Sequence, residues 1–274
     1  MNDRILRYKY VPLTESSLNI LREGTIKFTK PSEFNDPFDC NPDYDPMAYA
    51  DFLLRNKSLL KRAGDAMHLS PAQRLQNRSK MAKRIENSIK NDNFPNGFVD
   101  DVGILSLSRD PLNLLMWSHY ASNHTGFVVE LSIPQSASIT SDESDTLFLD
   151  CLFPLPVEYS PEKPIINPFD HRDLNASKQF LVKSTDWIYE KEERVIDFLR
   201  GPGVHPFKQK EILKSVIAGI KMSDEDYERL ECEVIKVNDR IGANISIYKA
   251  KPCKGKFSIY IPDRWDLSSH SECC

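Results

Sequence analysis

Two glutamates only two residues apart, Glu190 and Glu192, lie in a segment that also carries aromatic and basic side chains, residues 187–198. From Arg194 onward polar and apolar residues tend to alternate, which predicts a half-buried strand. Side chains two apart on an extended backbone share a face, so we expect the two carboxylates to point the same way. Beside the tryptophan and tyrosine of the segment, such a pair predicts a site for a polar ligand with an aromatic wall. The alternative is a solvated strand end, with Lys191 and Arg194 as counter-charges.

The spacing of the other candidate ligands does not indicate a metal site. His119 and His124 are five residues apart, which is the wrong helical spacing for joint metal ligation, and no HExxH motif occurs. The acidic loop that contains Asp36 and Asp39 lacks the glycine and the terminal glutamate of a calcium loop. Neither GxxxxGK nor GxGxxG is present, so no phosphate-binding loop is indicated. We therefore predict no metal ligands and interpret the two histidines as core or surface residues.

The composition indicates a globular protein with one local excess of positive charge. Of the 274 residues, 40% are hydrophobic and 28% are charged, and the net charge of -4 gives no overall basic character. Residues 51–90, however, contain ten lysines and arginines and only three acids. This segment predicts either phosphate contacts or a solvated helical pair, and the near absence of aromatic residues argues against base stacking. The candidate nucleic-acid contacts are Arg55, Lys57, Arg78, Lys83 and Arg84.

The termini and cysteines indicate a reduced, cytoplasmic protein without membrane contact. The polar N-terminus lacks the apolar core of a signal peptide, and no apolar run approaches the ~18 residues of a membrane span. The six cysteines include no CxxC pair, which indicates neither a zinc ribbon nor a disulfide framework. The terminal Cys-Cys has a second interpretation as a prenylation signal. The oligomeric state cannot be inferred from these patterns.

Strands and helices are predicted in irregular order, without a steady βαβ rhythm, which favours a single α+β domain over residues 1–274 with a helical insertion at 46–92. The 245–250 and 256–261 strands are expected to pair, and residues 132–146 are expected to form a mobile loop. The expected strands are 5–10, 25–29, 101–108, 127–131, 147–159, 215–220, 245–250 and 256–261. The expected helices are 14–23, 46–91 with a break at Ser70-Pro71, 112–121, 173–183 and 223–235.

Four blocks of the sequence together resemble DUF2971, an uncharacterised bacterial family. The resemblance covers roughly residues 5 to 220, and its loop and Trp-x-His-Tyr blocks are the most specific. The family name alone implies no chemistry. The blocks are Tyr8-Lys9-Tyr10, the loop 31–39 (PSEFNDPFD), Ser106-Leu107-Ser108 with residues 116–120 (MWSHY), and residues 189–194 (YEKEER).

The same blocks resemble, more distantly, the ADP-ribosyltransferases, which split NAD between nicotinamide and ribose. That family uses a polar residue on a first strand, a Ser-x-Ser or Tyr on a later strand, and a glutamate at the head of another, often as Glu-x-Glu. Here Tyr8-Lys9-Tyr10, Ser106-Leu107-Ser108 and Glu190-Lys191-Glu192 occur in that order. The first block departs from the pattern, because neither the usual histidine nor an arginine is in place, although Arg7 and Lys9 flank the position. The resemblance implies a mixed, mainly antiparallel split sheet.

The resemblance also implies an activity: NAD cleavage and transfer of ADP-ribose to nucleic acid or protein, in bacterial anti-phage defence or as a toxin. Glu192 would stabilise the positive charge that develops on the ribose. Glu190 would orient or deprotonate the acceptor nucleophile. Tyr120 is the third expected catalytic residue, and it or Trp117 would stack on nicotinamide. The expected NAD contacts are Lys9, Tyr10, Ser106, Ser108, Trp117 and His119.

Three other activities stay open at this point. One is NAD hydrolysis without a macromolecular acceptor. Another is a metal-dependent nuclease that uses Asp36, Asp39 and Glu190, although lysine directly follows Glu190 and the usual Asp…Glu-x-Lys spacing is therefore missing. The last is a non-catalytic nucleic-acid-binding or regulatory module with the basic helices as its contact face, for which salt-sensitive binding without turnover would be diagnostic.

Overall fold

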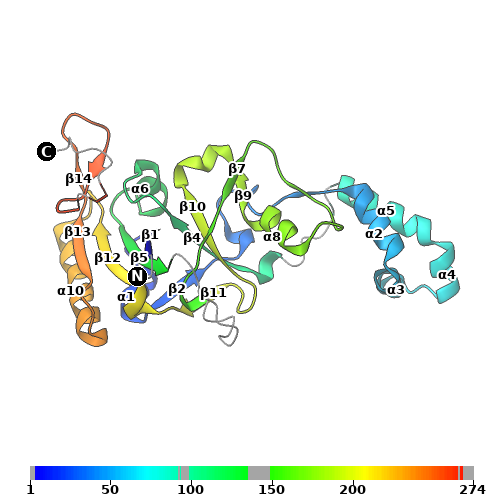
Figure 1. The fold of residues 1–274 in the computed structure, drawn as a ribbon, viewed down its shortest axis with the longest axis horizontal. Coiled ribbons are helices and arrows are strands. Elements are labelled where there is room, and N and C mark those ends of the chain that lie inside the picture. Colours follow the sequence, from blue (N-terminus) through cyan, green and yellow to red (C-terminus); the bar gives the residue numbers. More distant parts are fainter. Residues whose placement is uncertain (1–3, 92, 94–98, 135–148, 265, 268–274) are drawn as a thin grey trace. The chain divides into compact units, whose positions relative to one another are not determined.

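The computed structural model describes residues 4–91, 93, 99–134, 149–264 and 266–267. These residues form an α+β protein with a mainly antiparallel sheet, which confirms the predicted class (Figure 1). The chain divides into two compact units. The first comprises Met1–Glu33, Asp100–Val157 and Asp186–Cys274, and the second comprises Phe34–Val99 and Glu158–Thr185, including the predicted helical insertion.

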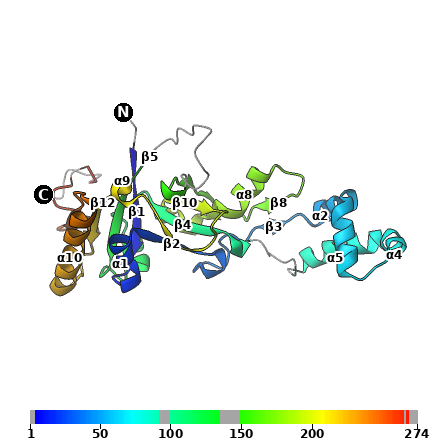
Figure 2. The same cartoon turned by 90° about the horizontal axis from the view of Figure 1, so that it is seen from below.

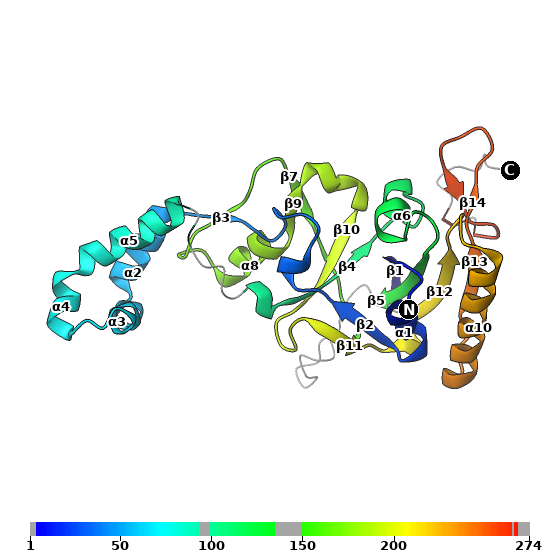
Figure 3. The same cartoon turned by 180° about the vertical axis from the view of Figure 1, so that it is seen from behind.

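A seven-stranded sheet forms the centre of the first unit, in the order β13-β12-β5-β1-β4-β10-β6 (Figure 3). Each neighbouring pair is antiparallel except β12 and β13, which run parallel. The strands are β1 (Arg4–Val11), β4 (Gly103–Ser108), β5 (Phe127–Pro134), β6 (Leu155–Pro156), β10 (Glu192–Asp197), β12 (Leu213–Ala218) and β13 (Ser246–Lys249).

The sheet is split between β1 and β4. On one side β1 pairs with β5 along its full length, from Arg4 opposite Pro134 to Val11 opposite Phe127. On the other side its only Cα partner in β4 is Ser108, opposite Tyr8. The two strands therefore separate beyond this pair, and the main-chain groups there need partners other than the neighbouring strand.

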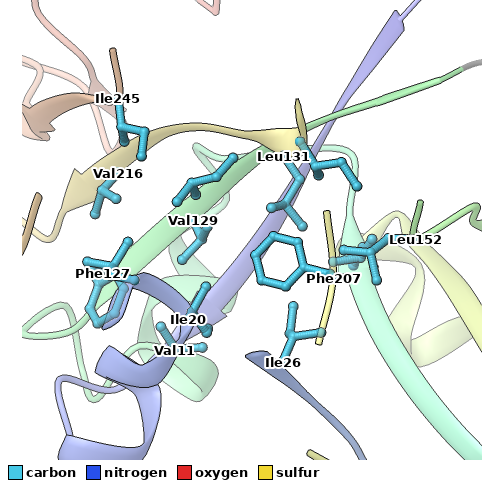
Figure 4. Packing of buried hydrophobic residues seen from close by; sticks show 14 of the residues in the cluster. Val11, Ile20, Ile26, Phe127, Val129, Leu131, Leu152, Phe207, Val216 and Ile245 are labelled. Atoms are coloured by element: carbon cyan, nitrogen blue, oxygen red, sulfur yellow. The ribbon is translucent and has the colours of Figure 1, made fainter. Parts of the chain in front are cut away.

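Helices α1 (Glu15–Arg22) and α10 (Asp224–Ile241) cover one face of the sheet (Figure 2). The predicted caps of α1 are confirmed: the Thr14 side chain accepts from the amide of Ser17, and Gly24 adopts a φ of 63° just after the helix. Fully buried side chains of β5 pack in this layer with residues of α1 and with Phe207 (Figure 4). The other face of the sheet packs against α6 (Leu114–Tyr120).

The helical segment of the second unit is divided into more helices than the interrupted pair that the sequence predicts. The 46–91 segment forms four helices, because Asn56 begins an additional helix as its N-cap and Asn77 ends one and precedes the next. Ser70, at the predicted break, is the N-cap of the third helix and forms a capping box with Gln73. The helices are α2 (Pro46–Arg55), α3 (Lys57–Ala66), α4 (Pro71–Gln76), α5 (Arg78–Lys90) and, farther along the chain, α8 (Arg172–Phe180).

Short elements complete the two units. The second unit has two parallel pairs, β3 (Asp43–Tyr44) with β8 (Ile165–Ile166) and β7 (Glu158–Ser160) with β9 (Val182–Ser184). The first unit has β2 (Thr25–Phe28) with β11 (Gly203–Pro206), β14 (Lys251–Pro252) with β15 (Ile259–Tyr260), the helix α9 (Gln209–Ile212), and 3-10 turns at Pro31–Glu33, Val99–Asp101 and Thr185–Glu190. In the part of the chain that the structure describes, no helix is both long enough and apolar enough to cross a bilayer.

Two sequence predictions about the strands need correction. Residues 245–250 and 256–261 do not pair, because β13 aligns parallel to β12 while β15 pairs with β14. The strand expected at 147–159 is replaced by β6 and β7, which are short. Most of the predicted mobile loop, residues 135–146, lies outside the described residues.

Candidate functional site

The three sequence blocks that suggest chemistry lie on neighbouring strands of the first unit. Ser108 of β4 is opposite Tyr8 of β1 on one side and opposite Glu192 of β10 on the other. Ser106 is opposite Arg194 in the next row but one. Opposed side chains of adjacent antiparallel strands lie about 4.5–5.5 Å apart at Cβ. Residues as far apart in the chain as Tyr8 and Glu192 thus form one row across three strands, which we call the Tyr8–Ser108–Glu192 row.

Lys9 lies where the sheet splits. Its Nζ donates to the main-chain oxygen of Ser106 at 3.0 Å, so its side chain satisfies a carbonyl on the separating strand. Burial lowers the pKa of Lys9 to about 8, in spite of the nearby carboxylates of Glu192 and Glu190, which favour its charged form. The ammonium is therefore within electrostatic reach of both predicted catalytic carboxylates.

Glu192 begins β10 and is held by a buried arginine. Arg194 Nε and Nη2 donate to its two carboxylate oxygens at 2.8 and 3.0 Å, and the arginine side chain is fully buried. Residues two apart on a strand share a face, which allows this two-point contact. The strand is buried on both faces, so the predicted half-buried strand is wrong. Arg194, expected only as a surface counter-charge, is instead the buried partner of the candidate catalytic glutamate.

Glu190 is not on the same strand as Glu192. It ends the 3-10 turn Thr185–Glu190, and Lys191 follows in a left-handed conformation with a φ of 46°. The predicted alternation of the two glutamates along one extended strand is therefore wrong. The Glu190 carboxylate accepts from the hydroxyl of Tyr120 at 2.5 Å, and its main-chain oxygen accepts from Ser108 Oγ at 2.7 Å.

Four partly exposed or exposed aromatic rings form a series that begins at Tyr120, the residue that donates to Glu190. Ring centroids are 5.9 Å apart between Trp187 and Tyr189, 6.2 Å between Tyr189 and His119, and 6.3 Å between His119 and Tyr120. We call these four rings the aromatic ladder. They provide the aromatic wall that the sequence predicts beside Glu190, and they come from both α6 and the 3-10 turn.

Trp117 and Tyr10 are expected from the sequence to contact NAD, but both lie in the core. Trp117 is fully buried, its Nε1 donates to Pro111 O at 2.8 Å, and its ring meets that of Tyr10 edge-on at 5.4 Å. The Tyr10 hydroxyl donates to Asp110 O at 2.6 Å. A tryptophan with no exposed surface cannot stack on a ligand, so Trp117 is corrected to a core residue.

A family match covers most of α6, both candidate glutamates and the first part of β10. Residues 116–195 match the family model described as "Protein of unknown function (DUF2971)". Over this segment the chain is similar to that family. The DUF2971 segment contains the whole aromatic ladder, Glu190, Glu192 and Arg194, but neither β1 nor β4. Searches of the curated proteins and of the solved structures find no match.

Sequence reasoning missed a buried pair next to this site. Glu130 of β5, opposite Tyr8, is fully buried and accepts from Arg264 Nη1 and Nη2 at 3.2 and 2.8 Å. Burial, with Glu130 nearby, raises the pKa of Tyr8 well above its ordinary value. No local pattern could have indicated the pair, because its members are separated by 134 residues.

The acids of the nuclease alternative make structural contacts within the second unit. Asp36 accepts from the amide of Phe38 at 2.9 Å, and Asp39 lies 3.5 Å from Lys183 Nζ. Glu190 belongs to the first unit. Among the described residues, no group of three or more His, Cys, Asp or Glu side chains is placed to hold a metal ion.

The five candidate nucleic-acid contacts all lie on the helices of the second unit, but they differ in their partners. Arg55 pairs with Asp51 at 2.8 Å and lies over the ring of Phe169, while Arg78 donates to Leu54 O. Both therefore support the helices themselves. The other three, Lys57, Lys83 and Arg84, are exposed.

His124, at the end of the α6 turn, predicts a pH dependence of stability. Its Nε2 lies 3.1 Å from Ser118 Oγ, but its buried Nδ1 has no hydrogen-bond partner among the described residues. Burial lowers its pKa below the ordinary value. Because the unfolded chain then takes up the proton first, we expect stability to be complete above about pH 6.5 and to fall as the pH drops through the lowered pKa.

A His124→Asn variant tests this expectation, since asparagine tolerates the positive φ of 73° at this position. Urea unfolding followed by circular dichroism at about pH 7.5 and about pH 5.5 should show a smaller loss of stability in the variant than in the wild-type protein. Equal losses in the two proteins would show that His124 is not responsible.

Proposed function

We propose that the protein cleaves NAD and transfers the ADP-ribose to a macromolecule, either nucleic acid or protein. The observation that supports this most is the Tyr8–Ser108–Glu192 row, with Lys9 at the split of the sheet. The resemblance to ADP-ribosyltransferases requires these three blocks to meet, and one residue of each, Tyr8, Ser108 and Glu192, lies on one of three adjacent strands in spite of their separation in the chain. The split between β1 and β4 also fits the split sheet that the resemblance implies.

Glu192 supplies the charge that this reaction needs. When the bond between nicotinamide and the ribose breaks, the bonding electrons leave with nicotinamide and positive charge develops on the ribose. A fixed carboxylate that accepts from the ribose 2′-hydroxyl stabilises that charge. Arg194 holds the Glu192 carboxylate through both oxygens, so its orientation is set before the substrate binds.

The other groups bind NAD and the acceptor. Lys9 takes the place of the missing histidine or arginine of the first strand as the cation for the phosphates or ribose of NAD. Glu190, oriented by the Tyr120 hydroxyl, accepts the proton of the acceptor nucleophile as it attacks the ribose. The aromatic ladder stacks with nicotinamide. Transfer of this kind to a cellular macromolecule fits a role in bacterial anti-phage defence or as a toxin.

The direct test is incubation of the protein with NAD labelled separately in its nicotinamide and adenine portions, with a cell lysate and with purified nucleic acids. Transfer predicts free nicotinamide together with adenine label on a macromolecule, whose class is identified by protease and nuclease digestion. Free nicotinamide with only soluble ADP-ribose would identify an NAD hydrolase. No release of nicotinamide above the buffer control would overturn the proposal.

Lys9 predicts a pH dependence of NAD binding. Its pKa of about 8 means that the ammonium loses its charge as the pH rises through that value, while an arginine stays charged throughout. We expect the KM for NAD to rise above about pH 8 in the wild-type protein and to stay flat in a Lys9→Arg variant. The KM is measured from initial rates of nicotinamide release across this range. A parallel rise in both proteins would assign the pH dependence to another group.

A further inference from the structure

A second feature of the molecule, independent of the row, is an array of positive charge on the helices of the second unit. Six of the exposed lysines and arginines of α3 and α5 neither form an ion pair with an acidic side chain nor donate to the main chain, among the residues that the structure describes. We call this set the basic surface. Its members are Lys57, Lys61 and Arg62 of α3 and Lys80, Lys83 and Arg84 of α5.

The other basic residues of these helices have structural partners, which separates them from the basic surface. Arg74 pairs with Asp65 and donates to Leu69 O at 2.8 Å, and Lys90 pairs with Glu86 at 2.5 Å. Arg55 and Arg78 are bound within the helices as described above. The three acids of residues 51–90 all pair with other residues, so the six members of the basic surface form no ion pair with them.

The geometry of α5 places its three charges on one side. Lys80, Lys83 and Arg84 follow the spacing of neighbours on one helix face, and 1.5 Å of rise per residue separates the first from the last by about 6 Å. The opposite side of α5 is buried through Met81 and Ile89, and α2 packs closely with the helix. The charges are thus presented by a helix whose orientation within the group is fixed by packing.

Contacts also connect α3 to α5. Arg84 Nη1 of α5 lies 3.9 Å from Sδ of Met67, the C-cap residue of α3, and Arg78 at the start of α5 donates to Leu54 O of α2. The charges of the two helices therefore belong to one packed group of helices, in which α2 contacts both. Figure 1 shows α2, α3, α4 and α5 together in this group.

We propose that the basic surface binds double-stranded nucleic acid through its phosphates. Concentrated positive charge in a chain of net charge -4 favours a polyanion. Single strands are usually held by exposed aromatic rings, and α3 and α5, which carry the basic surface, contain no aromatic residue. Contacts to phosphates alone predict binding with little sequence preference. A use of the bound duplex as the ADP-ribose acceptor would rest on the proposed function, but the binding itself does not.

The test is the salt dependence of binding to a fluorescein-labelled DNA duplex of mixed sequence, followed by fluorescence anisotropy without NAD. With six phosphate contacts, we expect log K against log salt to have a slope of about -5 between about 50 and 200 mM salt. A Lys80→Gln/Lys83→Gln/Arg84→Gln variant should bind at least ~10-fold more weakly and reduce the slope to about -3. Glutamine is a good helix former, so circular dichroism should show an unchanged helix content.

The matched control carries the same three-charge change in the first unit, at the exposed residues Lys210, Lys214 and Lys254, each changed to glutamine. The proposal expects this control to keep the wild-type slope. Equal weakening of the two variants would show a response to net charge only, and it would overturn the assignment, as would the absence of duplex binding at about 50 mM salt or tighter binding to a single strand of the same sequence. Because no NAD is present, each of these outcomes leaves the test of nicotinamide release unaffected.

Discussion

A Glu192→Gln variant is expected to release nicotinamide from NAD about 100-fold more slowly than the wild-type protein, which is the usual scale for the loss of one electrostatic stabiliser of a transition state. Glutamine keeps the shape of the side chain but removes the charge that would face the developing positive charge on the ribose. It also leaves Arg194 buried without its carboxylate partner, at a cost in stability of up to about 3–5 kcal/mol. The rate must therefore be expressed per folded molecule, with the folded fraction taken from circular dichroism.

The adjacent residue provides a matched control for the loss of stability. Glu193 points to the opposite face of β10 and accepts from Arg7 Nε and Nη2 at 2.5 and 2.7 Å. Glu193→Gln therefore breaks a similar two-point ion pair one residue away without changing the Tyr8–Ser108–Glu192 row. We expect it to retain cleavage per folded molecule. Wild-type cleavage by the Glu192→Gln variant, or an equal loss in both variants, would contradict the role of Glu192.

An Arg264→Met variant is expected to lose about 3–5 kcal/mol of unfolding free energy, since it leaves the carboxylate of Glu130 buried and unpaired. Glu130 has no exposed surface, whereas the second partner of Arg264, Asp266, is exposed, so most of the loss is expected from the Glu130 pair. The described tryptophans, Trp117 and Trp187, belong to the first unit and the sequence of the second unit contains none, so urea unfolding followed by tryptophan fluorescence reports on the unit that contains the pair.

Two further variants separate the buried charge from the loss of packing. Replacing both members, as Glu130→Met with Arg264→Met, should recover most of the lost stability, because a well-packed apolar pair often replaces a buried ion pair at little cost. Lys249→Met removes a pair with the exposed Asp224 and should change stability by less than about 1 kcal/mol. If the double variant were as unstable as Arg264→Met, the unpaired charge would not be the cause.

Local signals predicted those parts of the fold that local chemistry determines. Thr14 and Gly24 mark the two ends of α1 because a side-chain cap and a positive φ need only their immediate neighbours. Pairing of distant strands is not determined in this way. The 245–250 segment has the composition of a strand, but its partner in the structure is β12, and a parallel neighbour leaves no turn signal in the sequence.

The candidate site was predictable to a similar extent. The three sequence blocks indicated which strands carry the candidate site residues. The register of the sheet then places Tyr8, Ser108 and Glu192 side by side. Alternation could not show that Glu190 ends a 3-10 turn, because the left-handed Lys191 is not a residue type that announces this conformation. Nor could it separate Trp117 from Tyr120, which are three residues apart on α6, since one faces the core and the other a carboxylate contributed from 70 residues away.

The narrow junction between β1 and β4 has a consequence for how the sheet moves. Four strands lie on one side of it and three on the other, and within the sheet a single register pair joins the two groups. Native-state hydrogen exchange should then show two sets of protected amides that open with different free energies.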